Sequence, residues 1–248
     1  MTKSKVYIFG NGFLAKQLLE GINTHLKNAK DSRFGAVIID DRIQSARDVD
    51  NALAKARATY GEPFAIINAI GKTGVPNVDW CEDHKEETFF SNVEIPLLLA
   101  EAAWRENLTL IHVSSGCIFN GPGPFTSSSV PNFDGSYYSY TKLQAERRLT
   151  MMHAHYQNAN LEMHRIRMPF LDHEDPRNLL TKLQSYATVV DTPNSITYVP
   201  DYVDMVANRL FNIYRVSSFS GWRNQKGTIH IINATNPGAV THRQIIEM

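Results

Sequence analysis

Short apolar runs alternate with longer amphipathic segments along the first 168 residues of the chain. The short runs have the length of buried strands, and in the longer segments the apolar residues recur at the spacing of one helix face. From Phe13 to Ile22, for example, the apolar positions fall on one such face. This alternation predicts an α/β fold, a Rossmann-type doubly wound parallel sheet. The predicted strands are residues 6–9, 36–39, 64–68, 108–113 and 161–168.

The segments between these runs predict the helices of the same fold. A loop rich in glycine, proline and serine, residues 120–136, precedes the last helix. The longest helix is expected to bend near Pro96, because proline removes a backbone donor inside a helix. Beyond Pro169 the signals are shorter and more mixed, which favours a small C-terminal lobe, residues 169–248, over a continued sheet. The predicted helices are residues 13–22, 48–60, 79–107 and 137–156.

The composition is that of a folded protein, with 43% hydrophobic and 20% charged residues in a chain of 248. Lys plus Arg and Asp plus Glu number 25 each, so the net charge is zero, which argues against a broad nucleic-acid or anionic-membrane surface. No apolar run approaches the roughly 18 residues of a membrane-spanning helix, and none near the N-terminus forms a signal-peptide core. The two cysteines, Cys81 and Cys117, are too few for a disulfide framework. We therefore expect a cytoplasmic protein without a membrane or nucleic-acid partner.

A first candidate site lies between the first strand and the first helix, where Gly10, Gly12 and Ala15 form a G-x-G-x-x-A turn. Glycines let the backbone approach a pyrophosphate, and the helix N-terminus offers free N–H groups and a positive dipole. This context favours dinucleotide binding over a merely tight turn. After the second strand, Asp41 would bind the ribose hydroxyls of NAD, or Arg42 the 2′-phosphate of NADP. A solvated charge cluster is the alternative for both residues.

A second candidate site is the pair Tyr138 and Lys142, one turn apart on one face of the helix 137–156. The spacing alone is common, but the pair follows the fourth strand, at the carboxyl edge of the sheet where open α/β folds bind ligands. A lysine one turn away favours the phenolate, so it would lower the pKa of Tyr138 and make it a proton donor or acceptor near neutrality. Ser115, at the end of the strand, would hydrogen-bond the same substrate oxygen.

Together these motifs resemble the extended short-chain dehydrogenase/reductase family. The glycine turn differs from the family's usual pattern: members of the family usually have G-x-x-G-x-x-G, whereas the turn of this chain is one residue tighter and ends in Ala15. The resemblance is carried by the Gly10 turn, Asn68-Ala69-Ile70-Gly71 after the third strand, Asn92 in the long helix, Ser115, and Tyr138 with Lys142.

Further segments look like those of nucleotide-rhamnose synthase/epimerase-reductases, and the simpler 4-dehydrorhamnose reductases lack this string of segments. The resemblance implies 3,5-epimerisation and 4-reduction of a UDP- or dTDP-linked 4-keto-6-deoxyglucose, with NADPH, or alternatively NADH, as cofactor. It also implies an NAD(P)-binding domain over residues 1–168, a substrate-binding lobe over 169–248, and a homodimer. The segments are residues 74–82, 116–119, 131–133, 165–169 and 176–178.

The resemblance also implies roles for individual residues. Carbons 3 and 5 both adjoin the C4 ketone, so a single oxyanion site made by Ser115 and Tyr138 would serve both activities. Cys117 and Lys182 match the cysteine and lysine that move protons in epimerisation. Packing as a small hydrophobe is the alternative for Cys117, and an exposed helix lysine is the alternative for Lys182. Cys81 is interpreted as structural, and the scattered histidines predict no metal site.

The implied site residues form three sets. The catalytic set is Ser115, Tyr138, Lys142, Cys117 and Lys182. The cofactor-binding set is Gly10, Asn11, Gly12, Phe13, Leu14, Asp41, Arg42, Asn68, Ala69, Ile70, Gly71, Asn92, Tyr138, Lys142 and Met168. The substrate set is Ser115, Cys117, Arg177, Asn178 and Lys182.

Two other functions stay open from the sequence. One is a reductase that only reduces and receives sugar that is already epimerised. The other is an idle, reductase-like regulatory subunit, against which the joint presence of Ser115, Tyr138 and Lys142 speaks. The chain stops at residues 241–248, in the first turns of a predicted helix, whereas the resembling enzymes continue, so we expect either a truncated chain or a shortened form with a more open site.

Overall fold

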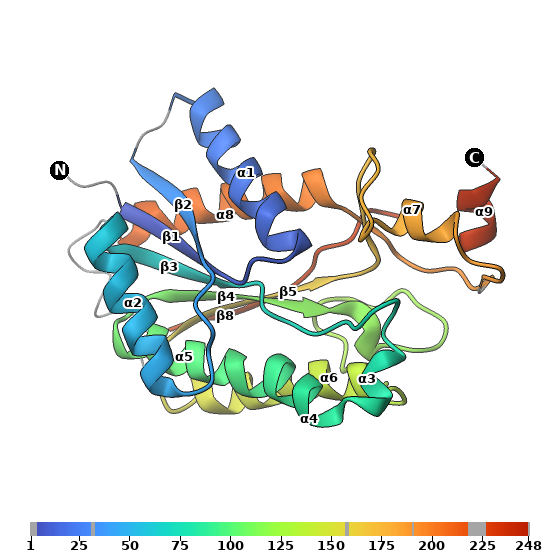
Figure 1. Cartoon of the computed structure of the whole chain (residues 1–248), viewed down its shortest axis with the longest axis horizontal. Helices are drawn as coiled ribbons and strands as arrows, with labels where there is room; N and C mark the ends of the chain where they lie inside the picture. The colour runs from blue at the N-terminus through green and yellow to red at the C-terminus, as the bar shows by residue number, and fades with distance from the viewer. Residues whose placement is uncertain (1–3, 31–32, 157–158, 190, 218–226, 248) are drawn as a thin grey trace.

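A six-stranded parallel sheet forms the centre of the molecule (Figure 1). The structure, a computed structural model, describes residues 4–30, 33–156, 159–189, 191–217 and 227–247. The strand order is β2-β1-β3-β4-β5-β8, which turns around between β1 and β3 and so confirms the predicted doubly wound fold. Such folds bind ligands outside the carboxyl ends of the strands at this switch point. The strands are β1 (Ser4–Phe9), β2 (Phe34–Ile39), β3 (Pro63–Asn68), β4 (Thr109–Ser115), β5 (Asn160–Ile166) and β8 (Ile229–Asn233).

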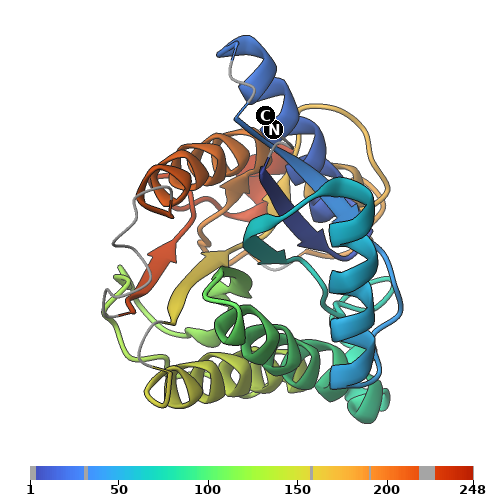
Figure 2. The same cartoon turned by 90° about the vertical axis from the view of Figure 1, so that its left-hand side faces the viewer.

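Helices cover both faces of this sheet (Figure 2). α1 and α8 pack on one face, whereas α2, α5 and α6 pack on the other. The side chains of β1 alternate accordingly: Val6 and Ile8 belong to the core under α1 and α8, and Tyr7 and Phe9 belong to the core under α2 and α5. These helices are α1 (Phe13–Asn28), α2 (Ala46–Tyr60), α5 (Ile95–Arg105), α6 (Tyr137–His153) and α8 (Val199–Ser217).

The predicted long helix over residues 79–107 is present but is broken into shorter pieces. Pro96 lies in the first turn of α5, where its missing N–H is not needed. The N–H of Ile95 donates to the carbonyl of Phe90, five residues back, so a π-helical turn carries the chain past the proline. The irregularity expected near Pro96 takes this form. The pieces before α5 are α3 (Trp80–Asp83), α4 (Lys85–Phe89) and the π-helical turn η1 (Phe90–Glu94).

The prediction that the sheet does not continue beyond residue 168 is wrong. β8 pairs in parallel with β5 at the sheet edge, and α8 packs against α1. No buried apolar run marks β8 in the sequence, because His230 is exposed and the other residues of this edge strand are only half-buried. The last part of the chain therefore contributes to the sheet as well as to a lobe, and the division at residue 168 stays a prediction about ligand binding.

A small lobe lies beyond the carboxyl ends of the strands, at the right of Figure 1. It contains a short parallel pair, β6 with β7, and the helix α7 packed against α9. Among the described residues, no helix is both long and apolar enough to cross a membrane. The elements of the lobe are β6 (Pro169–Phe170), α7 (Leu179–Leu183), β7 (Thr197–Tyr198) and α9 (His242–Ile246).

Candidate active site

The turn after β1 lies against the segment that follows β3. Gly10 has a φ of +107°, a conformation that L side chains rarely adopt. A Cβ placed there would also lie 3.2 Å from the backbone carbon and oxygen of Ala69. Glycine is therefore required at this point for two independent reasons, and the turn brings the start of α1 to the switch point of the sheet.

The N-terminus of α1 has free backbone donors. Gly12 is the N-cap, it makes no side-chain cap hydrogen bond, and a Cβ on it would meet open space. The first intrahelical bond runs from the N–H of Lys16 to the carbonyl of Gly12, at 3.1 Å, so the N–H groups of Phe13 and Leu14 have no acceptor within the helix. Open backbone donors and a positive helix end fit a pyrophosphate, which supports the cofactor-binding role predicted for residues 10–14.

The charged residues predicted to contact the ribose lie after β2, the neighbour of β1 in the sheet. Asp41 accepts a 2.8 Å hydrogen bond from Lys55 at the surface, and this pairing raises the pKa of Lys55. Arg42 is exposed. Their position after β2 fits the predicted contact with the ribose end of a dinucleotide, and the two residues do not decide between NAD and NADP.

The asparagines predicted to bind the cofactor use their side chains on the protein itself. Buried Asn68 contacts the His112 ring at 3.1 Å and accepts from the N–H of Ile70 at 3.0 Å. Asn92, in the π-helical turn, accepts from the N–H of Lys72 at 2.7 Å and donates to Thr141 on α6 at 3.1 Å. These side chains shape the backbone of residues 68–72, and the cofactor-binding role of Asn68 and Asn92 stays a prediction.

The carboxyl end of β4 brings the predicted catalytic residues together. Ser115 is the last residue of β4, and its Oγ accepts from the N–H of Cys117 at 3.1 Å, which starts the 3-10 turn η2 (Gly116–Ile118). Tyr138, on the first turn of α6, is buried and hydrogen-bonds Ser115. The strand end and the helix start thus place a hydroxyl, a phenol and a thiol around one point.

The electrostatics of this site differ from the expectation for Tyr138. Burial, and next the thiol of Cys117, raise the pKa of the phenol, and the Ser115 hydrogen bond opposes them only in part. The Lys142 ammonium instead donates to the carbonyl of Val113 at 2.9 Å, and burial lowers the pKa of Lys142 to about 8. The expected lowering of the Tyr138 pKa by Lys142 is therefore not found, and Tyr138 is a protonated donor at neutral pH.

The predicted substrate residues of the lobe have different surroundings. Arg177 is exposed, whereas Asn178 is buried and caps α7, with its amide bound to the backbone of Leu171 and His173. Asn178 therefore shapes the lobe instead of facing a ligand with its side chain. Lys182 is half-buried in α7, where burial, and next the charge of Arg177, lower its pKa.

Lys182 and Cys117 are carried by different elements. α7 packs against α9 and β6, whereas η2 packs against α6. The structure thus joins Cys117 to Ser115 and Tyr138, and it leaves Lys182 with the lobe. Met168, the last predicted cofactor residue, is half-buried between β5 and β6 with a φ of +44°.

One charged residue near the phenol is absent from the predicted set. The charge of Arg167 acts against the raised pKa of Tyr138, and after burial it helps to lower the pKa of His242 in α9. Its guanidinium donates to Asn194 at 2.6 Å. Its Cδ would lie 3.4 Å from a Cβ on Gly116. Arg167 thus links the strand end to the lobe. Its position directly after β5, at the ligand edge of the sheet, was the signal that could have identified it. Among the described residues, no group of three or more metal-ligating side chains is found.

Comparison with known proteins decides the family. A family model described as the RmlD substrate binding domain matches residues 6–243. The chain belongs to this family. Relatives support the resemblance seen in the sequence: a bifunctional dTDP-4-dehydrorhamnose 3,5-epimerase/dTDP-4-dehydrorhamnose reductase of Arabidopsis thaliana is 36% identical over 228 residues. A trifunctional UDP-glucose 4,6-dehydratase/UDP-4-keto-6-deoxy-D-glucose 3,5-epimerase/UDP-4-keto-L-rhamnose-reductase of the same plant is 35% identical over 224 residues.

The matches cover 87% of this chain but only 65% of the bifunctional relative and 29% of the trifunctional one. Among solved structures, the UDP-rhamnose synthase of Acanthamoeba polyphaga mimivirus matches with a TM-score of 0.74 and 27% identity, over 99% of this chain and 79% of that one. A dTDP-4-dehydrorhamnose reductase of Bacillus anthracis in complex with NADP matches with a TM-score of 0.69 over 100% of this chain and 81% of that one. At 18% identity, the latter shows the fold alone.

Proposed function

We propose that this RmlD-family protein is an NADPH-dependent enzyme that epimerises carbons 3 and 5 and reduces carbon 4 of a nucleotide-linked 4-keto-6-deoxyhexose, forming nucleotide-L-rhamnose. The observation that carries the proposal is the meeting of Ser115, Tyr138 and Cys117 at the end of β4. The names of the two plant relatives join the same activities. An oxyanion site and an acid/base group side by side are what that combination requires.

The cofactor would lie between the Gly10 turn and this site. The α1 N-terminus would hold its pyrophosphate, and Asp41 and Arg42 would meet its ribose end. When bound, NADPH supplies a hydride; NADH is the alternative, and the Asp41–Lys55 pairing does not favour either one.

The reduction step uses the protonated phenol. Ser115 and Tyr138 would donate hydrogen bonds to O4 of the sugar and polarise the C4 carbonyl. As a hydride adds to carbon 4, the carbonyl electron pair moves to O4, and Tyr138 gives its proton to that oxygen. Tyr138 carries its proton before the step, because burial raises the pKa of the phenol. The ammonium of Lys142, one turn away on α6, is assigned to the phenolate that remains; in the protein without ligand it donates to the carbonyl of Val113.

Epimerisation would use the same oxyanion site. A base removes the proton from carbon 3 or carbon 5, and the electron pair moves into an enolate whose negative charge lies on O4, held by Ser115 and Tyr138. A proton returned on the opposite face inverts the carbon, with no net oxidation. Cys117 lies beside Ser115 and is assigned to one of these proton transfers, and Lys182 to the other. Its lowered pKa makes the Lys182 ammonium a better acid than an exposed lysine.

A direct test supplies purified protein with UDP- and dTDP-linked 4-keto-6-deoxyglucose in heavy water, separately with NADPH and NADH. The proposal expects cofactor oxidation and deuterium at carbons 3 and 5 of the product. Cys117→Ser is expected to lose the exchange while it still reduces sugar that is already epimerised. Absence of both oxidation and exchange with all four combinations would refute the proposal.

Two outcomes would select a narrower function. Normal reduction of sugar that is already epimerised, without enzyme-dependent deuterium exchange at carbons 3 and 5, would indicate an enzyme that only reduces. Binding of a dinucleotide without any turnover would indicate a regulatory subunit. The same preparation, measured by analytical ultracentrifugation, tests the homodimer that the resemblance implies.

A further inference from the structure

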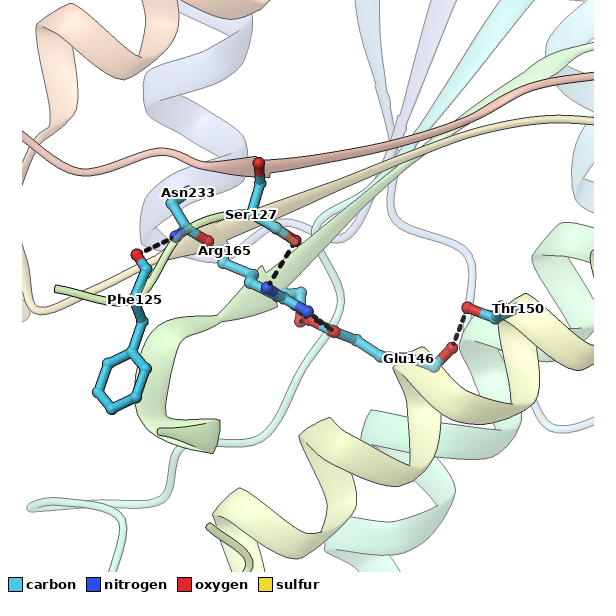
Figure 3. Close-up of polar contacts among 7 residues, drawn as sticks. Phe125, Ser127, Glu146, Thr150, Arg165 and Asn233 are labelled. Atoms are coloured by element: carbon cyan, nitrogen blue, oxygen red, sulfur yellow. Dashed lines mark hydrogen bonds and ion pairs between the residues drawn. The ribbon is translucent and has the colours of Figure 1, made fainter. Parts of the chain in front are cut away.

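A buried ion pair lies directly behind the site. Arg165, on β5, donates from Nη2 to Oε2 of Glu146 at 2.7 Å and from Nε to both carboxylate oxygens at 3.0 and 3.2 Å (Figure 3). The side chains are 3% and 6% exposed. Glu146 is on α6, one turn beyond Lys142 and two turns beyond Tyr138, so the carboxylate belongs to the helix that carries the proposed proton donor.

The pair joins every element that builds the site. Ser114, the residue before Ser115, donates its hydroxyl proton to Oε1 of Glu146 at 2.5 Å. Arg165 lies opposite Ser114 in the sheet, and its Nη1 approaches the carbonyl of Ser127 in the loop after η2 at 3.4 Å. β4, β5, α6 and this loop thus meet at one carboxylate and one guanidinium.

The loop after η2 is held by further contacts around the same guanidinium. The Arg165 guanidinium carbon lies 5.1 Å from the centre of the Phe119 ring, which stacks on Phe125 at 4.7 Å. Asn233, the last residue of β8, donates to the carbonyl of Phe125 at 2.9 Å (Figure 3). The strand ends β4, β5 and β8 therefore share one anchored loop beside the proposed substrate site.

Burial of two charges requires a compensating reason. Taking a carboxylate and a guanidinium out of water is costly, and apolar side chains of similar volume often stabilise a fold equally well. The pair satisfies its own hydrogen bonds through Ser114 and Ser127, and its directional contacts fix the register between α6 and the ends of β4 and β5. We therefore expect the pair to act through the register that it imposes between α6 and the ends of β4 and β5.

We propose that Glu146 is a positioning residue of this site: its carboxylate, held by Arg165 and Ser114, fixes the helix that carries Tyr138 and Lys142 against the strand that carries Ser115. The inference rests on the proposed function only for its kinetic consequence, because the register and the charge of Lys142 are properties of the protein without any ligand. Glu146 contacts neither substrate nor cofactor in this arrangement.

The same carboxylate also affects the charge of the lysine. Burial lowers the pKa of Lys142 to about 8, and the negative charge of Glu146 acts in the opposite direction. The other titratable groups that face the ammonium are Cys117 in η2, which also raises its pKa, and buried His112 on β4. Removal of the Glu146 charge therefore lowers the pKa of Lys142 further, and the ammonium is lost at a lower pH.

Glu146→Gln tests the inference, with Glu162→Gln as the matched control on the opposite face of β5. We expect Glu146→Gln to lower kcat by about tenfold to a hundredfold at neutral pH, with KM nearly unchanged. The alkaline limb of its kcat profile is expected at lower pH than in the wild type. Glu162→Gln is expected to leave both kcat and the position of this limb within about twofold of the wild type.

A second readout keeps the inference independent of turnover and of the stability of one variant. In the ligand-free protein, NMR titration of labelled lysine side chains, with Lys142→Arg for assignment, is expected to show Lys142 titrating at lower pH in Glu146→Gln than in the wild type. The double variant Glu146→Gln/Arg165→Met, which removes both buried charges, is expected to show a downward shift smaller than that of the single variant, because the loss of the Arg165 cation offsets part of the loss of the Glu146 anion. It serves as the readout if the single variant does not fold.

The outcomes separate the two proposals. A wild type that turns over no 4-keto sugar would refute the proposed function, and the lysine titration would still decide the role of Glu146. Wild-type turnover with an unchanged kcat, alkaline limb and Lys142 titration in Glu146→Gln would overturn the positioning inference alone. Equal effects of Glu162→Gln and Glu146→Gln would also overturn it, because they would indicate a general loss of packing.

Discussion

Two buried glutamate–arginine networks lie on opposite faces of β5. On the α6 face, Glu146 binds Arg165 at the carboxyl end of the sheet, next to Ser115. On the α8 face, Glu162 accepts from Arg209 at 2.5 Å and contacts His164, and Glu162 lies opposite Ile111 in the middle of β4. The chemistry of the two networks is the same, but their places along the strand differ.

The position of each network along β5 determines whether its buried charges can affect turnover. The Glu162 network fastens the crossover helix α8 to β5, and Tyr202 on that helix extends it by a 3.3 Å contact to His164. The Glu146 network fastens α6 and the loop after η2 at the edge of the sheet where ligands bind. One network should therefore govern stability alone, and the other should govern stability and turnover together.

The largest effect is expected from Lys142→Met. It removes the ammonium that stabilises the Tyr138 phenolate, so kcat should fall about a thousandfold, within the range of general acid–base contributions. Steady-state kinetics measure the loss of kcat, and cofactor fluorescence titration measures how far the loss of a predicted cofactor-binding residue also weakens cofactor affinity. A kcat within threefold of the wild type would contradict the role assigned to Lys142 in stabilising the Tyr138 phenolate.

Arg209→Met tests the other network. It leaves buried Glu162 without its guanidinium partner, so the free energy of unfolding should fall by about 3 kcal/mol, the lower end of the range for broken buried pairs. Chemical denaturation measures this loss, and kcat per folded molecule is expected to be unchanged. A kcat loss as large as that of Glu146→Gln would contradict the division between the two networks.

Ser114→Ala sharpens the comparison with a smaller change. It removes the hydroxyl that donates to Glu146 but leaves the Arg165 contacts in place. We expect a loss of about 1.5 kcal/mol in unfolding free energy, typical of a hydrogen bond to a charged group, and a kcat reduction smaller than that of Glu146→Gln. The two values come from denaturation and steady-state kinetics on the same preparation, with wild type as reference.

The last prediction concerns the acid dependence of stability, which changes only outside the neutral pH range. Burial acts to raise the pKa of Glu162, but the hydrogen bonds and charges of His164 and Arg209 outweigh it and lower the pKa to about 2. Because the folded-state pKa lies below the ordinary glutamate value of 4.5, this contribution to stability is complete above that value and is lost as the pH falls toward 2. Denaturation from neutral to acidic pH should therefore show a shallower loss in Glu162→Gln than in the wild type.

Most of the fold was predictable from the sequence, because buried parallel strands read as uninterrupted apolar runs. β1 to β5 and the helices between them follow that pattern. β8 was not predictable in this way, since an edge strand with exposed His230 carries no such run. The π-helical turn before Pro96 was visible only as an expected irregularity, because the sequence does not show which hydrogen-bond pattern accommodates the proline.

The candidate site was predictable in its motifs and not in its electrostatics. Gly10 is at a backbone position that requires glycine, and Ser115 and Tyr138 meet as the resemblance implied. Burial, which no spacing reveals, reverses the expected direction of the Tyr138 pKa. The side chains of Asn68 and Asn178 are bound to backbone groups that only tertiary structure brings near. Arg165 and Glu146 were unpredictable as a pair, because they are separated by 19 positions in the chain.

The central claim is that one oxyanion site at the end of β4 serves both activities. The most direct test is Tyr138→Phe in heavy water with a 4-keto-6-deoxyglucose nucleotide and NADPH, in which reduction at carbon 4 and deuterium exchange at carbons 3 and 5 are followed together. The account predicts that both rates fall by a similar factor, of order a hundredfold or more, because both intermediates place negative charge on O4. Exchange at the wild-type rate together with lost reduction would contradict it and would indicate that epimerisation takes place at a separate site.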